Sequence, residues 1–328
     1  MLLHIRYTDF NFYFFMSVKP RVIIIDAMHK SIVPLLEAAG YEPDHQPNIK
    51  RDEIIKILPQ YDGMIVRSKT VIDTELLGHS TLKFIARAGA GIDQLDVDEI
   101  EKRGIRIVNA PEGNRDALGE HALGLLLNVV NNINKSDHEV RQGIWDREGN
   151  RGYEVKGKTV GIIGYGYMGS AFAEKLSGLS CKVMAYDKYK QNFSDQYVEE
   201  VTMSTLYQEA DILSLHVPLT DETRFMVNKS FLGSFKKKLI FLNTSRGEVV
   251  SLKDTLDMIK SGKIRCAGFD VLENEKLDHL TSEQDVIYQE LFQLNNVVFT
   301  PHIGGWTEES YQRINEILIE KIKSLQMI

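Results

Sequence analysis

The sequence predicts an α/β fold in which parallel sheets are covered by helices on both faces. Short apolar runs that end in polar or glycine residues alternate along the chain with segments of helical periodicity. This alternation occurs in two blocks, and 328 residues are enough for two domains of ordinary size. We therefore expect two α/β domains, each with its own core.

Four short apolar runs are the strand candidates of the first block. They cover residues 21–26, 63–68, 83–89 and 105–111, with helical segments such as residues 95–104 between them. Residues 1–20 precede this pattern, so we treat them as an N-terminal extension and expect Met16 to be the natural start. The extension is aromatic, but Asp9 and Asn11 interrupt its apolar run and no small-residue cleavage site follows, unlike in a signal peptide.

Six further strand candidates make up the second block, at residues 158–164, 182–187, 211–218, 239–245, 264–271 and 296–302. Between the blocks, residues 114–140 are predicted to form one long helix whose apolar middle must be buried on several sides. Residues 307–325 are predicted to form a final helix that begins after an N-cap at Thr307. Its apolar stripe, which needs a core to pack against, consists of Tyr311, Ile314, Leu318, Ile322 and Leu325.

The composition is that of a globular protein, with 43% hydrophobic and 26% charged residues. Lys and Arg number 39 against 46 Asp and Glu, so the net charge of −7 gives no support for binding to nucleic acid or to an anionic membrane. No segment approaches the about 18 apolar residues of a membrane span. Cys181 and Cys266 lack metal-ligand spacing, which argues against a disulfide framework or a metal site and favours a reducing cytoplasm.

The turn after the first strand of the second block carries Gly164, Gly166 and Gly169, and a helical segment follows it. In a dinucleotide site the first glycine permits the turn, the second lets the backbone approach a pyrophosphate, and the third lets helix and strand pack closely. Asp187 ends the next strand 23 residues after Gly164, where a carboxylate can bind both ribose hydroxyls. This combination predicts NAD rather than NADP, although Lys188 and Lys190 could soften that discrimination.

Three polar side chains lie beyond strands of the second block, at the edge where the cofactor is expected. Arg246 follows residues 239–245, Glu275 lies beyond residues 264–271, and His302 ends residues 296–302. Each has a structural explanation by itself, as a loop cap, a solvated acidic turn or a packed histidine. Together, an arginine can hold a carboxylate, a histidine can exchange a proton near neutral pH, and a glutamate can stabilise the charged histidine. This set fits the reversible reduction of a 2-oxo acid.

The chain also resembles the NAD-dependent D-2-hydroxyacid dehydrogenases, and within them the phosphoglycerate dehydrogenase group. The matching segments, in family order, are VRSKT, ARAGAGIDQLD, NAPEGN, GEHALGLLL, GIIGYGYMG, HVPLTDETR, NTSRGEVV, GFDVLENE and PHIGGWTEES. The resemblance implies two Rossmann-like or flavodoxin-like domains, with a cofactor domain (residues 114–301) inserted into a discontinuous substrate domain (residues 21–113 and 302–328). It also implies a reaction in the interdomain cleft, NAD as the cofactor, and a homodimer.

The resemblance assigns roles to individual residues. It implies that Arg246, Glu275 and His302 are catalytic, with Arg246 on the substrate carboxylate and Glu275 paired to the acid/base His302. The implied substrate-binding set is Arg67, Ser68, Gly89, Ala90, Gly91 and Arg246. The implied cofactor-binding set is Gly164, Gly166, Tyr167, Met168, Gly169, Asp187, His216, Val217, Pro218, Thr223, Thr244, Ser245, Arg246, Asp270, His302 and Gly304, with Asp270 against the nicotinamide carboxamide. By their own sequence context, His121 and His216 favour structural roles, and Tyr165, Tyr167 and Met168 favour packing or turn roles.

The chain departs from the family pattern in three respects. Lys276 follows Glu275 where a proline is usual, which puts the rigidity of that loop in doubt. Tyr167 stands where arginine is frequent, so a pyrophosphate would depend more heavily on backbone donors. The serine-binding domain of longer phosphoglycerate dehydrogenases has no counterpart after the last helix, so we expect a short form without that regulation.

The leading hypothesis is hydride transfer between NAD(H) and a small D-2-hydroxy acid or 2-oxo acid. The preferred pair is 3-phosphoglycerate and 3-phosphohydroxypyruvate, which would place the reaction in serine biosynthesis. Glyoxylate, hydroxypyruvate or D-lactate chemistry is the alternative, because these substrates present the same carboxylate and keto group. A different class of function is an NAD(H)-sensing regulator on the same fold, but a sensor has no need for a proton donor.

Overall fold

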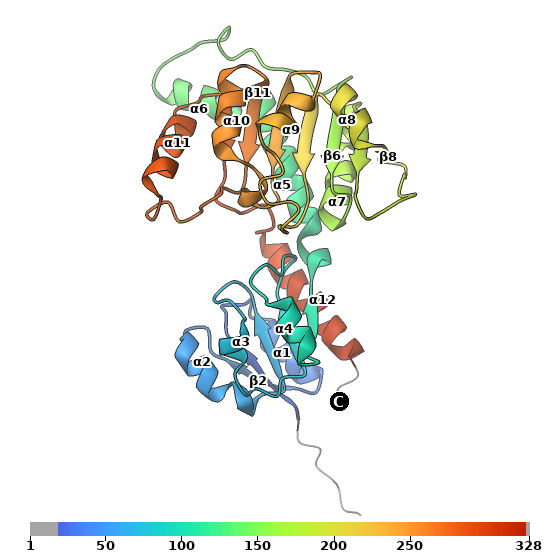
Figure 1. The fold of residues 1–328 in the computed structure, drawn as a ribbon, viewed down its shortest axis with the longest axis vertical. Helices are drawn as coiled ribbons and strands as arrows, with labels where there is room; N and C mark the ends of the chain where they lie inside the picture. The colour runs from blue at the N-terminus through green and yellow to red at the C-terminus, as the bar shows by residue number, and fades with distance from the viewer. Residues whose placement is uncertain (1–18, 326–328) are drawn as a thin grey trace, which may run out of the picture.

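The computed structural model describes residues 19–325, so the start predicted at Met16 and residues 326–328 lie outside the described residues. Two parallel α/β units lie one above the other, and two helices run between them (Figure 1). This architecture confirms the predicted fold class. The bounds given above for the two domains stay a prediction.

The N-terminal sheet has five parallel strands in the flavodoxin-like order β2-β1-β3-β4-β5. The strands are β1 (Arg21–Ile24), β2 (Glu42–His45), β3 (Gly63–Val66), β4 (Phe84–Arg87) and β5 (Arg106–Asn109). Helices α1 (Ile32–Ala38) and α12 (Glu308–Ser324) cover one face, and α2 (Arg51–Ile57), α3 (Thr74–Leu77) and α4 (Val97–Lys102) cover the other. The last helix therefore completes the core that the first strands begin.

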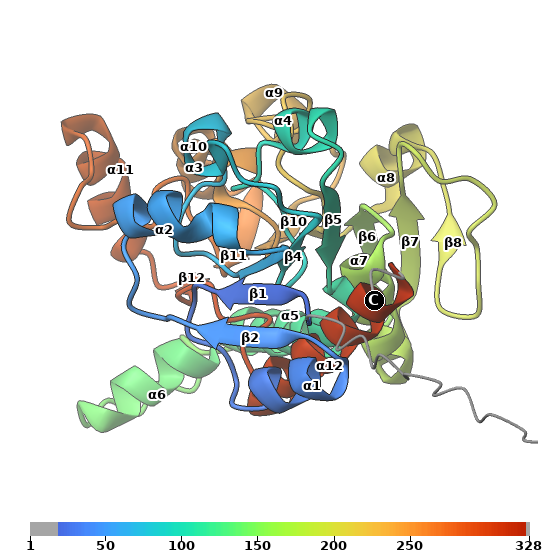
Figure 2. The ribbon, with the colours of Figure 1, turned by 90° about the horizontal axis from the view of Figure 1, so that it is seen from below.

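Helix α12 has the start and the buried stripe that the sequence predicts. The Thr307 hydroxyl accepts a hydrogen bond from Ser310 N, which makes it the N-cap. Ile314, Leu318 and Ile322 are buried against the N-terminal sheet, whereas Tyr311 and Leu325, at the ends of the stripe, are only half-buried. Figure 2 shows α12 beside α1 below this sheet.

The C-terminal sheet has seven parallel strands in the order β12-β11-β10-β9-β6-β7-β8, the Rossmann order with one strand added. The strands are β6 (Thr159–Ile163), β7 (Lys182–Tyr186), β8 (Glu199–Glu200), β9 (Ile212–Leu215), β10 (Leu239–Asn243), β11 (Ile264–Phe269) and β12 (Val297–Phe299). Helix α7 (Tyr167–Lys175) and helix α5 (Pro111–Asn131) cover one face. The other face is covered by α8 (Met203–Glu209), α9 (Lys229–Ser234), α10 (Leu252–Lys260) and α11 (Ser282–Phe292).

The prediction of a single helix over residues 114–140 is wrong. The structure has two helices there, α5 and α6 (Ile133–Arg141), which are separated at Asn132. Asn132 has φ of 53°, a left-handed conformation that ends a helix and that asparagine tolerates better than most residues. The Asn128 side chain also bonds Asn134 through both its oxygen, at 3.0 Å to the backbone N, and its nitrogen, at 2.8 Å to Oδ1. These side-chain bonds replace the helical ladder across the break.

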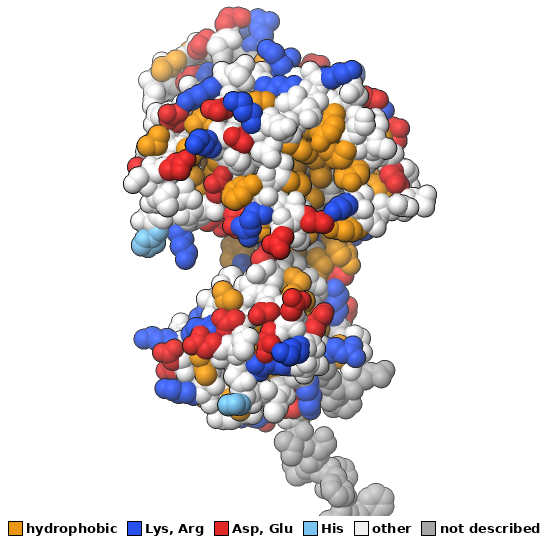
Figure 3. Space-filling view, in the orientation of Figure 1, with side chains coloured by type: hydrophobic (Ala, Val, Ile, Leu, Met, Phe, Trp, Pro, Cys, Tyr) orange, Lys and Arg blue, Asp and Glu red, His pale blue; other side chains and the backbone are white. Residues whose placement is uncertain are grey.

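The two helices between the units cross very closely. A Cβ at Gly113, at the start of α5, would lie 2.7 Å from Ile314 Cα in α12, so only glycine fits this crossing. Figure 3 shows the narrow waist there, with acidic and basic side chains interspersed over the face in view. Within residues 19–325, no helix has both the length and the apolarity to cross a membrane.

Candidate active site

A cleft of about 700 Å³ lies between the carboxyl ends of the two sheets, and both units line it. The proposed site residues that line it are Ala90, Gly91, Gly166, Tyr167, Met168, His216, Val217, Pro218, Thr244, Ser245, Arg246, Asp270 and His302. The proposed residues outside this lining are Arg67, Ser68, Gly89, Gly164, Gly169, Asp187, Thr223, Glu275 and Gly304. Four of the second group, Gly164, Thr223, Glu275 and Gly304, contact members of the first.

His302 and Glu275 are paired at the cleft. Nδ1 of His302 lies 3.0 Å from the Glu275 carboxylate, and both side chains are 47% exposed. A carboxylate acceptor at Nδ1 makes that nitrogen the donor and leaves Nε2 available to a reacting group. The backbone at His302 has φ of 56°, an uncommon left-handed conformation for a residue other than glycine.

The loop that carries Glu275 is held without the proline that the family usually has there. Asn274 N donates to the hydroxyl of Tyr288 at 2.8 Å, and that hydroxyl donates back to Asn274 O at 3.1 Å. The Asn274 side chain accepts from Lys276 N at 3.0 Å and donates to His279 O at 3.1 Å. Since Tyr288 is buried, Asn274 attaches the loop to the core and supplies rigidity that the sequence left in doubt.

Asp270 holds the turn that contains His302. This buried carboxylate accepts from Thr300 Oγ1 at 2.6 Å, Ile303 N at 2.9 Å and Gly304 N at 2.8 Å. His121, on α5, places Nε2 3.2 Å from it. Burial by itself would raise the pKa of Asp270, but these donors outweigh burial and hold the pKa below its usual value. The proposed contact of Asp270 with a nicotinamide carboxamide stays a prediction.

Arg246 reaches from the end of β10 to the opposite unit. Its Nε and Nη2 lie 3.0 Å and 2.8 Å from Oδ2 of Asp93, in the loop after β4, and Nη1 donates to Ser245 O at 2.7 Å. A Cβ at Gly91 would lie 1.7 Å from Arg246 Nη2, so the guanidinium approaches because this residue is glycine. Asp93 was not among the residues predicted for the site.

A second arginine in the cleft, Arg87, was also missed. It ends β4 and packs against Gly89, and its Nε has no hydrogen-bond partner among the described residues. Burial, and then repulsion from Arg246, lower the pKa of Arg87 to about 10, so it stays charged at neutral pH. The rule that polar groups at strand ends face the ligand would have found it, had that rule been applied to the first block as well.

Arg67 lies beside the cleft at the end of β3. Its guanidinium carbon is 3.5 Å from the ring centroid of Trp306, a cation–π contact with the segment that leads into α12. Asp26 accepts from Arg67 N at 2.7 Å and from Ser68 N at 3.4 Å, which positions this pair of residues. Burial lowers the pKa of Arg67.

The glycine loop has the geometry that a dinucleotide site requires. Gly164 has φ of 92°, and a Cβ there would lie 2.5 Å from His216 O. A Cβ at Gly169 would lie 2.1 Å from Gly164 O, so helix and strand pack at contact distance. A Cβ added at Gly166, the N-cap of α7, would have no other atom within 4 Å. The N-terminus of this helix is therefore open to the cleft.

Asp187 lies in a neighbouring cavity at the end of β7. It accepts from Tyr165 N at 2.8 Å, Tyr189 N at 2.9 Å and Lys190 N at 3.0 Å. Burial by itself would raise the pKa of Asp187, but the three N–H donors have the larger effect and hold the pKa below its usual value. The carboxylate is therefore charged at neutral pH. Lys188 pairs with Glu222 at 2.6 Å and the Lys190 ammonium donates to Tyr165 O at 2.8 Å, so both lysines already have partners in the described residues.

Two of the polar atoms that the C-terminal unit presents to the cleft are buried without partners in the described part of the chain. They are Thr244 Oγ1 and His216 Nδ1. Burial lowers the pKa of His216 to about 3, so its ring is neutral, and its Nε2 lies 2.9 Å from Ser214 Oγ. Unpartnered buried groups beside an open helix N-terminus fit a bound cofactor with hydroxyl and amide groups. Thr223, by contrast, donates to Pro218 O at 2.7 Å and supports the turn behind the cleft.

The comparisons with known proteins agree on one family. Residues 123–304 match the family model described as "D-isomer specific 2-hydroxyacid dehydrogenase, NAD binding domain". The chain is 35% identical over 303 residues to hydroxypyruvate reductase from Thermotoga maritima, covering 92% of this chain and 97% of that protein. It is 33% identical to D-3-phosphoglycerate dehydrogenase from Archaeoglobus fulgidus over 93% of this chain, but spans only 57% of that longer protein.

The chain is also similar in structure to a dehydrogenase that was crystallised with its ligands. D-lactate dehydrogenase from Aquifex aeolicus, crystallised with NAD and lactic acid, superposes with a TM-score of 0.79 at 25% identity. The match covers 93% of this chain and 95% of that one. The likeness therefore includes both units and the cleft between them.

Proposed function

The chain belongs to the D-isomer specific 2-hydroxyacid dehydrogenase family, and on that premise we propose that its substrate pair is 3-phosphohydroxypyruvate and D-3-phosphoglycerate. The protein is an oxidoreductase acting on CH–OH donors, and its cofactor is NAD. The observation that carries the choice of substrate is the number of arginines at the cleft. One arginine is enough to bind the substrate carboxylate. Additional arginines at the cleft are explained if the same substrate also carries a phosphate group.

Arg87 supplies the strongest support for a second anionic group. It is half-buried, Arg246 repels it while Asp93 attracts it, and its Nε is unpartnered. Holding a charged guanidinium in such a place is costly unless an anion joins it. Arg67, beside the cleft, is also partly desolvated. We assign the substrate carboxylate to Arg246 and the phosphate to Arg87 and Arg67.

We assign proton transfer to the pair formed by His302 and Glu275. Bound NADH supplies the hydride. His302 Nε2 donates a proton to the substrate oxygen on reduction and takes it back on oxidation, while Nδ1 stays bonded to Glu275. Glu275 fixes the ring and stabilises its charged form. Asp93 holds one edge of the Arg246 guanidinium, which leaves the other N–H groups for the substrate carboxylate.

The ratio of kcat/KM values for four oxo acids tests the substrate. Phosphohydroxypyruvate, hydroxypyruvate, glyoxylate and pyruvate share the reacting group and differ in what the N-terminal unit must hold. We expect the highest kcat/KM for phosphohydroxypyruvate. A higher kcat/KM for hydroxypyruvate or glyoxylate would contradict this choice of substrate. Hydroxypyruvate is the substrate named for the Thermotoga maritima relative.

The same experiment separates the enzyme from an NAD(H)-sensing regulator. An enzyme consumes NADH when an oxo acid is supplied, so absorbance of the reduced nicotinamide falls. Tight NADH binding without turnover of any of the four acids would favour the regulator. We further place the reaction in serine biosynthesis in the cytoplasm, which predicts rescue of a bacterial serine auxotroph that lacks phosphoglycerate dehydrogenase.

We also propose a homodimer. No residue of α6 is buried, and this helix extends from the body of the molecule (Figure 2). Ile133, Val140, Ile144 and Trp145 on α6 and the following loop are exposed, with Trp145 at 80%. Apolar side chains gathered on a projecting segment are typical of a subunit contact. Light scattering coupled to size exclusion measures the mass, and Trp145→Glu should shift it toward the monomer.

A further inference from the structure

A second cavity, of about 260 Å³, lies at the opposite edge of the C-terminal sheet from the cleft. Lys158, Asp211 and Lys238 come directly before β6, β9 and β10, and Arg265 lies near the start of β11. Because β6, β9, β10 and β11 are neighbours and parallel, these side chains gather at one place. A five-residue strand spans roughly 17 Å, so this cavity is separate from the cleft.

Positive charge dominates this cavity. Its only carboxylate, Asp211, is already engaged, since its Oδ2 lies 2.9 Å from the Lys237 ammonium and 3.0 Å from Thr159 N. Lys158, Lys238 and Arg265 form no ion pair with any carboxylate in residues 19–325. Three uncompensated cations therefore surround one cavity of a protein whose net charge is −7.

Several exposed lysines of this unit are paired with carboxylates, unlike Lys158 and Lys238. Lys182 lies 3.1 Å from Glu199 and 3.2 Å from Glu209, and Lys253 lies 2.9 Å from Glu283. Cations held together without acids repel one another. Their grouping is explained if an anion from solution compensates them.

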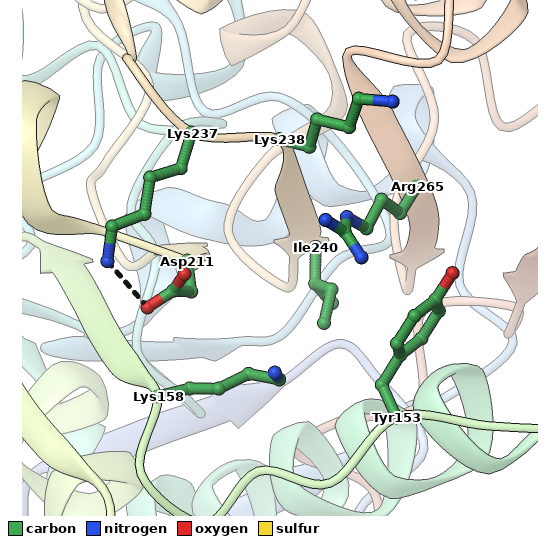
Figure 4. Close-up of a pocket in the computed structure, with 7 residues that line it drawn as sticks. All are labelled: Tyr153, Lys158, Asp211, Lys237, Lys238, Ile240 and Arg265. Atoms are coloured by element: carbon green, nitrogen blue, oxygen red, sulfur yellow. Dashed lines mark hydrogen bonds and ion pairs between the residues drawn. The ribbon is translucent and has the colours of Figure 1, made fainter.

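Two of these side chains are also directed at a common space. Figure 4 shows the Arg265 guanidinium and the Lys158 ammonium pointing toward the space beside Ile240, with Lys238 along the rim. Ile240 is buried and gives the cavity an apolar floor, and the Tyr153 ring lies 5.2 Å from the Arg265 guanidinium carbon. An arginine fork binds a phosphate through two N–H groups, and a lysine adds a compact charge.

We propose that this cavity binds the phosphate group of a small anionic metabolite, at a site independent of the reaction in the cleft. Arg265 and Lys158 contact the phosphate oxygens from two sides, and Lys238 adds positive charge at the rim. The Lys237–Asp211 pair closes the remaining side. The volume suits a phosphate group with a few attached atoms.

Binding of inorganic pyrophosphate tests this site. Isothermal titration is carried out on the full chain at constant ionic strength, with NADH present, for the parent and for Lys158→Gln/Arg265→Gln. The matched control is Arg147→Gln/Lys236→Gln, which removes the same charge from exposed residues outside the cavity. We expect the double variant to bind at least about tenfold more weakly, corresponding to about 1.4 kcal/mol, and the control to bind like the parent.

Three results would overturn the proposal. They are no pyrophosphate binding to the parent, equal affinity in the parent and the cavity variant, and equal losses in the cavity and control variants. Equal affinity would locate the anion elsewhere, such as at the arginines of the cleft. Equal losses would mean that general charge and not the cavity attracts the anion. The kcat and KM of the cavity variant should match the parent, so failure here leaves the proposed reaction untouched.

Discussion

The two walls of the cleft differ in how far the charged side chains assigned to the reaction and to the substrate phosphate are already bonded. On the wall from the C-terminal sheet, Asp270 accepts three hydrogen bonds and lies 3.2 Å from His121 Nε2, and His302 is fixed to Glu275. On the wall from the N-terminal sheet, Arg87 carries an unpartnered Nε and Arg67 rests on an aromatic ring. We infer that the chemistry is built into the first wall before substrate arrives, whereas the second wall is completed by the substrate.

The largest expected effect comes from removing the proton donor on the pre-bonded wall. His302→Ala should lower kcat by about a hundredfold to ten-thousandfold, since general acid catalysis supplies that much. The dissociation constant for NADH, measured by fluorescence titration, should change little because the glycine loop is untouched. Near-normal turnover in this variant would contradict the role of His302.

The second wall should affect the choice of substrate more than the rate of the chemical step. Arg87→Gln removes a charged donor worth about 1.5–3 kcal/mol when bonded to an anion. We expect kcat/KM for phosphohydroxypyruvate to fall by about ten- to a hundredfold, with a much smaller change for hydroxypyruvate. Arg106→Gln, on the exposed side of β5, is the matched control. Equal losses of kcat/KM for both substrates would contradict the assignment of the phosphate to Arg87.

Asp93 connects the two walls through Arg246, and Asp93→Asn tests that connection. The pair is about one-third exposed, so its loss should be worth about 1 kcal/mol, or roughly fivefold in kcat/KM. We expect KM to rise, because the guanidinium loses its orientation toward the substrate carboxylate. A lower KM would mean that Asp93 competes with the substrate for Arg246. Asp98→Asn, on the nearby helix α4, is the control.

The last prediction concerns the stability of the pre-bonded wall and not turnover. Asp270→Asn replaces one carboxylate oxygen with an NH2 group and leaves at least one buried donor without an acceptor, which should lower the unfolding free energy by about 1–3 kcal/mol at pH 7. The folded pKa of Asp270 lies below the unfolded value of 3.8, so its stabilisation is present above that pH and is lost as the pH falls through the folded pKa. Urea titrations from pH 7 to pH 3 should show the difference between parent and variant shrinking. If the difference in unfolding free energy between parent and variant did not depend on pH, the charge of Asp270 would not be the source of its stabilising effect.

The sequence was sufficient for the fold because both sheets follow from strong apolar periodicity. Strand β2, with the sequence EPDH, escaped detection because an edge strand needs neither apolar alternation nor a free N–H at Pro43. The break at Asn132 was missed because its cause is a pair of side-chain bonds between Asn128 and Asn134, which periodicity does not report.

The candidate site was predictable where a residue's role depends on its place at a strand end. Arg246 and His302 could be proposed in this way, and the structure puts both at one cleft. The partners Asp93 for Arg246 and His121 for Asp270 could not, because each contact joins elements far apart in the chain. Asn274 could not be recognised either, since its effect depends on the buried hydroxyl of Tyr288.

The left-handed backbone at His302 has a consequence for how this protein can change over generations. An L-residue in this conformation costs roughly 1–2 kcal/mol, which a glycine would avoid. His302→Gly should therefore melt at a higher temperature than His302→Ala, and both should be inactive; differential scanning calorimetry compares them. A lineage released from selection for turnover would gain stability by losing this histidine, so its retention requires continued use of the activity.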